Sequence, residues 1–194
     1  MYVFTLLTED LPAVPQVDLV LAISTISSNA NSNLAKIKGV VQELIDAYGV
    51  QRVYYSVILF GRVPNIRIRF TQQLDEAALK SAIQGLQRPS GGSSLSAALE
   101  TARGVFRDGR PDSKKVLLLV MDAKSGSSMG DVKETASKLE ENGIKVIPLM
   151  FGGQADPDET SATTTNKQNV VKANETSDTK AIAEEITQKV TDSE

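Results

Sequence analysis

"VDLVLAISTISSNANSN", residues 17–33, joins an apolar run to a run of small polar residues. The first seven residues are nearly all apolar and have the length of a strand, which is typical of a strand buried on both faces. From Asn33 to Tyr48 apolar side chains recur at helical spacing, and Gly49 follows as a C-cap. The stretch therefore predicts a strand, a polar loop and an amphipathic helix.

The rest of the chain repeats this alternation of strand and helix. Strands are predicted at 52–61, 65–70, 115–122 and 144–153, with a short edge strand at 168–174. Helices are predicted at 75–86, 96–106, 131–142 and 178–190, and the polar segment 152–167 is predicted to be a mobile loop. The alternation predicts a Rossmann-like α/β fold, in which a doubly wound, mostly parallel sheet has helices on both faces.

The pattern places one domain at residues 17–191. Residues 1–16 are then an N-terminal extension or a linker between modules, because "TEDLPAVPQ" at 8–16 is acidic and contains proline. Residues 192–194 form a short tail.

Composition excludes several classes of protein. The 194-residue chain has a net charge of -3, which argues against a generally basic nucleic-acid binder. It contains no Cys and no His, so thiol nucleophiles, Cys/His zinc sites and Ser-His-Asp triads are absent. No apolar run approaches the roughly 20 residues that span a bilayer, and the first ten residues lack the features of a secretory signal.

Three polar loops are the candidate functional region. One follows Ile23, one precedes the helix at Ser96, and one follows Val120. Parallel sheets carry their sites at the carboxyl ends of their strands, so all three loops are expected to converge on one edge.

The ordered set "DLVLAI", "YYSVILFG", "GGSSLSAALETA", "RPDSKKVLLLVMDAKSG" and "GIKVIPLMFG" resembles a von Willebrand factor type A domain over roughly residues 17 to 191. The chain is most similar to the extracellular-matrix kind found in type VI collagen and matrilins. The resemblance implies a metal-ion-dependent adhesion site, formed by an Asp-x-Ser-x-Ser loop, a Thr in a Gly-Gly loop and a later Asp. Carried over position by position, these ligands fall on Ser24, Ile26, Ser28, Ser93 and Asp122.

Two of those positions have lost the chemistry that the resemblance implies. Mg²⁺ requires about six oxygen ligands and relies on carboxylate charge. Ser24 removes one of two carboxylates, and Ile26 places a hydrocarbon where a hydroxyl is expected. We therefore expect a degenerate site without a metal cofactor, and any residual Mg²⁺ would depend on Ser28, Ser93 and Asp122.

Each feature of this edge also has a structural interpretation. Ser and Asn of the first loop could cap the following helix, and Gly91 and Gly92 could serve only a tight turn. Asp122 could cap or brace the loops.

A cluster of basic residues surrounds the end of one predicted helix and the start of the next strand. Cations at a helix C-terminus are stabilising, which gives the cluster a structural interpretation. An anionic glycan or an acidic stretch of collagen is the alternative. The cluster consists of Arg103, Arg107, Arg110, Lys114 and Lys115.

The function expected from the resemblance is a non-enzymatic binding module of a larger extracellular matrix or adhesive protein. Its expected partner is a protein such as collagen or another matrix component, with self-association between sister modules as a further expectation. An intracellular scaffold of the same fold is the alternative. A nucleotide-binding enzyme is disfavoured because "STISSNANSN" contains neither G-x-G-x-x-G nor a P-loop Lys.

The triplet Asn174-Glu175-Thr176 is an acceptor sequence for N-glycosylation. We predict that secretion of the chain from a eukaryotic cell adds glycan at Asn174, which mass spectrometry before and after deglycosylation would detect. An Asn174→Gln variant is the control. An unshifted mass of the secreted wild-type chain would remove this support for an extracellular setting.

Overall fold

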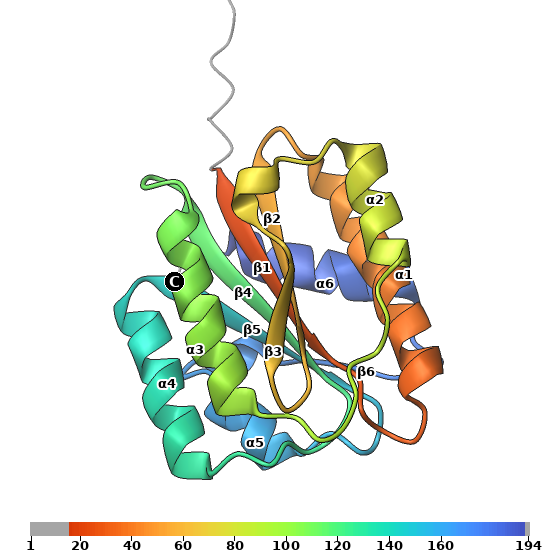
Figure 1. Ribbon diagram of the computed structural model, residues 1–194, viewed down its shortest axis with the longest axis vertical. Helices are drawn as coiled ribbons and strands as arrows, with labels where there is room; N and C mark the ends of the chain where they lie inside the picture. The colour runs from red at the N-terminus through yellow and green to blue at the C-terminus, as the bar shows by residue number, and fades with distance from the viewer. Residues whose placement is uncertain (1–15, 193–194) are drawn as a thin grey trace, which may run out of the picture.

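The computed structural model of the protein describes residues 16–192. Most of the predicted segment 1–16 and the end of the predicted tail therefore lie outside the described residues. Six strands form one sheet in the order β3-β2-β1-β4-β5-β6, and only β3 is antiparallel to its neighbour. The predicted α/β fold with a mostly parallel sheet is confirmed (Figure 1).

The observed elements lie close to the predicted ones. The strands are β1 Val17–Ser24, β2 Val53–Phe60, β3 Pro64–Ile68, β4 Lys114–Met121, β5 Ile144–Phe151 and β6 Val171–Ala173. The helices are α1 Ala30–Tyr48, α2 Glu76–Gln84, α3 Leu95–Val105, α4 Met129–Glu141, α5 Pro157–Ala162 and α6 Thr179–Thr191. None of these described helices is both long and apolar enough to cross a membrane.

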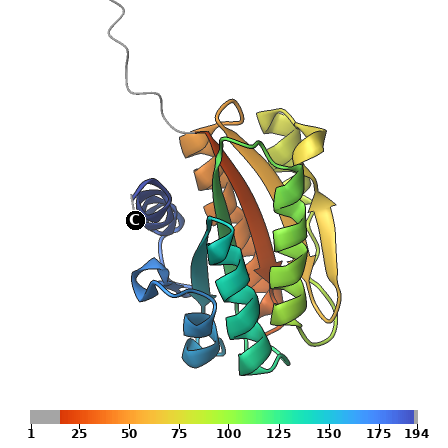
Figure 2. The same cartoon turned by 90° about the vertical axis from the view of Figure 1, so that its left-hand side faces the viewer.

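Two hydrophobic cores lie on opposite faces of the sheet. One packs α1, α2 and α6 against the odd-numbered apolar residues of β1, such as Leu19 and Leu21. The other packs α3 and α4 against Val20 and Ala22. In Figure 2, α3 and α4 lie in front of the sheet and α1 lies behind it. All eight residues of β1 are buried, as the apolar run predicts for a strand covered on both sides.

The prediction of a mobile loop over residues 152–167 is wrong in its centre. Residues 157–162 form α5, and the Asp156 side chain accepts hydrogen bonds from the backbone N–H groups of Asp158 and Glu159. Pro157 occupies the first turn, where its missing N–H costs nothing. The start signal Asp-Pro was therefore present in the sequence, but six residues are too few to show a helical apolar period.

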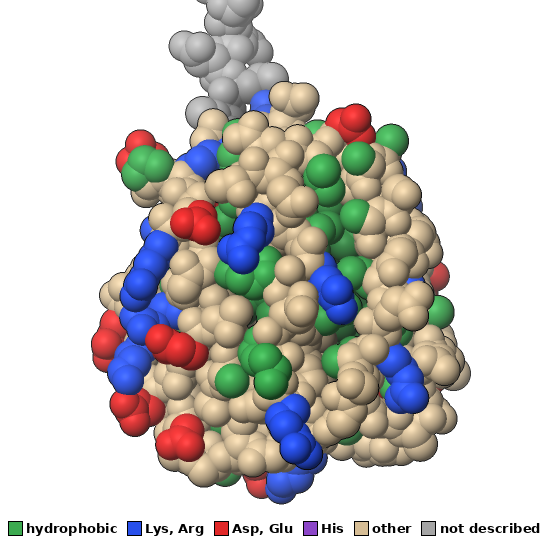
Figure 3. Space-filling model, viewed as in Figure 1, with side chains coloured by type: hydrophobic (Ala, Val, Ile, Leu, Met, Phe, Trp, Pro, Cys, Tyr) green, Lys and Arg blue, Asp and Glu red, His purple; other side chains and the backbone are tan. Residues whose placement is uncertain are grey.

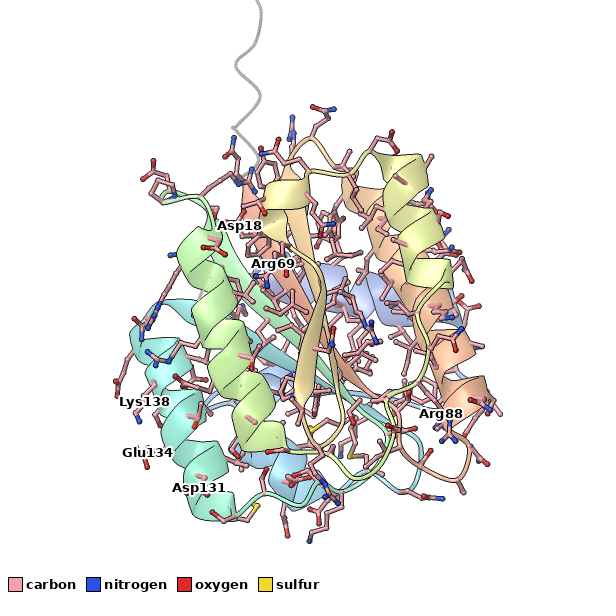
Figure 4. The ribbon with its side chains drawn as sticks, viewed as in Figure 1. Asp18, Arg69, Arg88, Asp131, Glu134 and Lys138 are labelled. Carbon is pink, nitrogen blue, oxygen red and sulfur yellow. The ribbon has the colours of Figure 1, made fainter. Side chains whose placement is uncertain are left out.

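One buried ion pair joins the amino-terminal end of β1 to the loop that precedes β4. Asp18 is fully buried, and its carboxylate accepts from Arg110 N at 2.6 Å and Arg110 Nε at 2.7 Å. The Arg110 guanidinium also donates to the Val17 carbonyl and lies 3.8 Å from the centroid of the Tyr54 ring. Figure 4 labels Asp18 near the start of β1. Arg110 therefore serves as the counter-charge that allows a carboxylate inside the sheet.

We predict that Asp18→Asn lowers the free energy of unfolding by about 3 kcal/mol, because removing one partner of a buried pair leaves the other without compensation. Chemical denaturation of the wild type and the variant would measure the change. Arg103→Gln is the control, since it breaks only a partly exposed pair with Glu100, and it should cost less than about 1 kcal/mol.

Two glycine variants provide an independent check. A Cβ on Gly109 would lie 2.5 Å from Asp18 Oδ2, so Gly109→Ala should also destabilise the fold. A Cβ on Gly104, within α3, would meet no atom within 4 Å, and Gly104→Ala should be neutral or stabilising by up to about 1 kcal/mol. Equal effects of the two variants would contradict this account of the ion pair.

Candidate functional site

The predicted convergence of three polar loops at the carboxyl edge of the sheet is confirmed. Asp122, directly after β4, accepts hydrogen bonds from the loop that follows β1. Gly126 N donates to the Ser93 carbonyl at 2.9 Å, and Ser96 N donates to Ser127 Oγ at 3.1 Å. These contacts join the loop before α3 to the loop after β4, so the three loops form one hydrogen-bonded surface.

The Asp122 carboxylate is the centre of this edge. It is 1% exposed, and each of its oxygens accepts two hydrogen bonds. Oδ1 accepts from Ile26 N at 2.7 Å and Ser27 N at 3.1 Å. Oδ2 accepts from Ser27 Oγ at 2.7 Å and Asn33 Nδ2 at 3.1 Å. Charge-assisted bonds of this kind stabilise a buried carboxylate without a cation.

Ser27 and Asn33 are hydrogen-bond partners of Asp122 that the sequence analysis did not single out. Asn33 Nδ2 also donates to Ser27 Oγ at 3.0 Å, so the two side chains and Asp122 form one network. Both are buried, whereas Ser28, which the resemblance did single out, is exposed. Asn33 lies in the first turn of α1, and nothing in the sequence distinguishes it from the other polar residues of "SSNANSN".

The other positions suggested by the resemblance occupy different environments. Ser24 is buried, and its hydroxyl has no hydrogen-bond partner; the same is true of Thr25 Oγ1. The Ile26 side chain is half-buried, and its backbone N–H donates a hydrogen bond to Asp122 Oδ1. Ser93 is buried and bonds through its carbonyl.

Ser28 turns away from Asp122 toward the loop after β5. Its hydroxyl accepts from Gln154 Nε2 at 2.6 Å, and its backbone N–H donates to Gln154 Oε1 at 3.3 Å. The structure therefore brings Ser24, Ile26, Ser93 and Asp122 to one edge and ties Ser28 to a fourth loop.

The alternative interpretation of the first loop as a side-chain cap of α1 is wrong. Asn29 is the N-cap residue, but its side chain makes no capping hydrogen bond. The Ser27 carbonyl accepts from Ala30 N instead, and the Ser27 side chain is directed to Asp122. Hydrogen bonds to Asp122, directly after β4, therefore hold the loop, and its side chains do not cap α1.

An ion pair lies at the rim of this edge. Lys124 Nζ is 2.8 Å from Asp156 Oδ2. The hydrogen bond from Lys124, followed by the backbone N–H of Glu159, lowers the pKa of Asp156 below its usual value. The same pair raises the pKa of Lys124. Both charges therefore stay in place near neutral pH and neutralise each other.

The residues of the basic cluster do not share one surface role. Arg103 pairs with Glu100, and Arg110 is committed to Asp18. Acidic and basic side chains alternate along the α3 and α4 side of the molecule (Figure 3). Lys114 and Lys115 lie instead at the start of β4, where they line a cavity together with Lys145.

Asn174 is exposed in the turn between β6 and α6. Its Oδ1 accepts from Thr176 N at 2.9 Å and from Thr176 Oγ1 at 2.7 Å. The acceptor triplet is thus a compact surface turn, and the addition of glycan there remains a prediction.

Within residues 16–192, no group of three or more Asp, Glu, His or Cys side chains is placed to hold a metal ion. Asp122 stands as a single carboxylate among neutral donors.

Comparison with known proteins gives a family and a set of similar structures. The family model described as "von Willebrand factor type A domain" matches residues 18–188. Proximal thread matrix protein 1 from the mussel byssus is 22% identical with a TM-score of 0.80, and the match covers 89% of this chain and 47% of that one. A structure of the same mussel protein with a zinc-occupied MIDAS motif is 21% identical, with the same coverage and a TM-score of 0.79.

Manganese-loaded Plasmodium vivax TRAP protein is 20% identical with a TM-score of 0.71, over 89% of this chain and 74% of that one. The present chain thus spans about half the length of the mussel protein and three quarters of the TRAP chain. At these identities the structural likeness shows the shared fold.

We predict that Asp122→Asn lowers the free energy of unfolding by about 1–3 kcal/mol. The amide nitrogen would face N–H or O–H donors where a carboxylate oxygen now accepts two bonds, which leaves buried donors unpaired. Urea denaturation in EDTA would measure the change.

Asp131→Asn is the matched control. Asp131 is exposed in the first turn of α4 (Figure 4), where loss of its charge removes only a helix-dipole contribution of less than about 1 kcal/mol. If Asp122→Asn were as mild as this control, the network would not hold the loops together.

Proposed function

The chain belongs to the von Willebrand factor type A domain family, and from that premise we propose that it is a non-enzymatic protein-binding module that acts without a bound metal ion. The observation that carries the proposal is the Asp122 carboxylate, whose two oxygens already accept four hydrogen bonds from Ile26, Ser27 and Asn33.

The residues at this edge fit a divalent cation poorly. A hard cation needs several oxygen ligands and substantial negative charge, but Asp122 is the single carboxylate of the network. The N–H groups of Ile26 and Ser27 occupy the lone pairs of Oδ1, and an N–H group cannot ligate a cation. The Ser24 hydroxyl stands where the family places a second carboxylate. These contacts support metal-independent binding.

The same edge carries the features of a protein-binding surface. Val63, in the turn between β2 and β3, is 76% exposed, and Met129, at the start of α4, is 37% exposed. They are the exposed large hydrophobic side chains among the described residues, and both follow the carboxyl ends of strands. Arg88, in the loop that precedes α3, adds an exposed charge (Figure 4). An apolar contact with a polar surround is typical of a protein interface.

We propose an extracellular setting in a matrix or adhesive protein, with collagen or another matrix component as the partner. The likeness to a mussel byssus matrix protein supports this setting, as does the exposed acceptor triplet at Asn174. Because the proposed binding needs no metal ion, an immobilised matrix ligand should bind the chain equally well in EDTA and in Mg²⁺. Surface plasmon resonance can test this expectation.

We predict that millimolar Mg²⁺, Mn²⁺ or EDTA leaves the melting temperature of the wild-type chain unchanged. An ion at a hundred times its Kd would stabilise the folded state by about 2.7 kcal/mol. That is a shift of several degrees for a domain of this size, since about 1 kcal/mol corresponds to roughly 2–4 °C. A clear Mg²⁺ shift in the wild type would contradict the proposal.

The double variant Ser24→Asp with Ile26→Ser is expected to gain an ion-dependent shift, because it restores one charge and one hydroxyl beside Asp122. Without an ion it should be less stable than the wild type, since the two carboxylates would repel each other. Ser24→Asn with Ile26→Ser is the matched neutral control and should show no shift. If neither variant responded, the backbone would not present its oxygens to an ion, and the assigned ligand positions would be wrong.

A further inference from the structure

We propose that a groove between α1 and the loop that follows α2 binds a glutamate side chain of a protein partner. The groove has a volume of about 310 Å³, which is at the small end of the range for ligand sites. The proposal rests on the proposed function, because it names the kind of protein that the binding edge receives. The groove is called the α1 groove, and its lining consists of Asn31, Leu34, Ala35, Lys38, Leu86, Gln87 and Arg88.

The α1 groove lies at the same edge of the sheet as Asp122. Positions 31, 34, 35 and 38 share one face of α1, because residues three and four apart are neighbours on a helix. The facing loop runs from Gly85 to Ser94, and Ser94 N donates to the Gly61 carbonyl at 2.9 Å. Gly61 directly follows β2, and α1 begins shortly after β1. Both walls of the groove are therefore anchored at the carboxyl ends of strands.

The described lining of the α1 groove contains two cations and no carboxylate. Arg88 is exposed, and Figure 4 shows it beside the start of α1. Within residues 16–192 its guanidinium makes no hydrogen bond or ion pair, whereas Arg103 and Arg110 each pair with a carboxylate. Lys38 is half-buried, and its Nζ donates to the neutral Gln84 carbonyl at 2.7 Å. An incoming carboxylate would thus meet two cations that lack an acidic partner in the described chain.

The acidic residues near this end of α1 do not fill the groove. The first turn of α1 contains no acidic residue. Glu175 contacts the helix start, where its Oε1 accepts from Asn29 Nδ2 at 3.5 Å, but it does not line the groove. Further along the helix, Asp46 pairs with Lys80. The positive charge of the groove is therefore available to a partner.

The α1 groove also has an apolar part, which decides between kinds of anion. Leu34 and Leu86 are buried and belong to the hydrophobic core on this face of the sheet. The planar guanidinium of an arginine can bind both oxygens of a carboxylate at once. Glutamate carries two methylene groups below its carboxylate, so its side chain matches both the leucines and the cations. A sulfated glycan supplies the charge with little apolar surface, and the groove therefore favours a glutamate.

An NMR titration of the isotope-labelled chain in EDTA, at constant ionic strength, would test the proposal. The probe is the acetylated and amidated peptide Gly-Leu-Glu-Leu-Gly, and EDTA excludes a bridging metal ion. We expect saturable binding, with shifts of the backbone amide signals centred on residues 31–38 and 86–88. The matched peptide with Gln in place of Glu keeps the shape without the charge. It should bind at least tenfold more weakly, because hydrogen bonds to a charged acceptor are stronger.

Two variants test the cations directly. Arg88→Gln and Lys38→Gln should each weaken binding of the Glu peptide at least tenfold, because each removes one of the two charges. Lys36→Gln is the matched control for Lys38, since Lys36 is also half-buried on α1 but does not line the groove. Arg107→Gln is the control for Arg88, since Arg107 is also exposed and follows α3 outside the groove. Both controls should bind as the wild type does.

The outcomes separate this proposal from the proposed function. No saturable shift with the Glu peptide, equal binding of the two peptides, or binding that both groove variants retain would overturn the proposal. A heparin oligosaccharide that binds more tightly than the Glu peptide and is lost in the same variants would overturn it in favour of a sulfated glycan. None of these results affects metal-independent binding of a matrix ligand, which surface plasmon resonance measures separately. Metal-dependent binding of that ligand would contradict the proposed function and leave the peptide result in place.

Discussion

The complete burial of β1 is the constraint on which the rest of the structure depends. Its eight residues pack against helices on both faces, so a charged group on the strand or directly beside its ends needs a partner inside the protein. At the amino end this group is Asp18, and Arg110 supplies the counter-charge. At the carboxyl end the chain continues directly into the loop whose backbone N–H groups bond to Asp122. The two ends of one buried strand thus fix the loops before and after β4.

Much of the fold could be predicted from the sequence because the strands between the helices are apolar runs that end in turn residues. Local signals also located Asp75, which caps α2 by accepting from Ala78 N, and Gly49, which has a φ of 65° at the end of α1. α5 was missed because six residues are too few to show a helical apolar period. A helix this short is stabilised by its packing rather than by its own sequence pattern. Propensity and pattern therefore describe long elements better than short ones.

The candidate site was less predictable, since its contacts join residues far apart in the chain. Asp122 was identified through its place after an apolar strand, but its partners Ser27 and Asn33 lie 95 and 89 positions away. The basic cluster illustrates the opposite error. Nearness in sequence grouped Arg110 with Lys114, whereas the fold directs Arg110 into the protein and brings Lys145 to Lys114 from another strand. Pairing across strands determines both outcomes, and no local pattern records it.

The donors around Asp122 determine what kind of binding surface this edge can be. A metal ion can exchange a protein ligand for one from a partner, so an ion-centred site can couple binding to rearrangement of its loops. Backbone N–H groups cannot leave in that way without breaking buried hydrogen bonds, which costs about 1–3 kcal/mol for each unpaired group. The loop after β1 therefore stays joined to β4 whenever the domain is folded. Under the proposed function, recognition at this edge depends on a preformed surface that includes Val63 and Met129, and affinity comes from shape and apolar contact rather than from a shared ion.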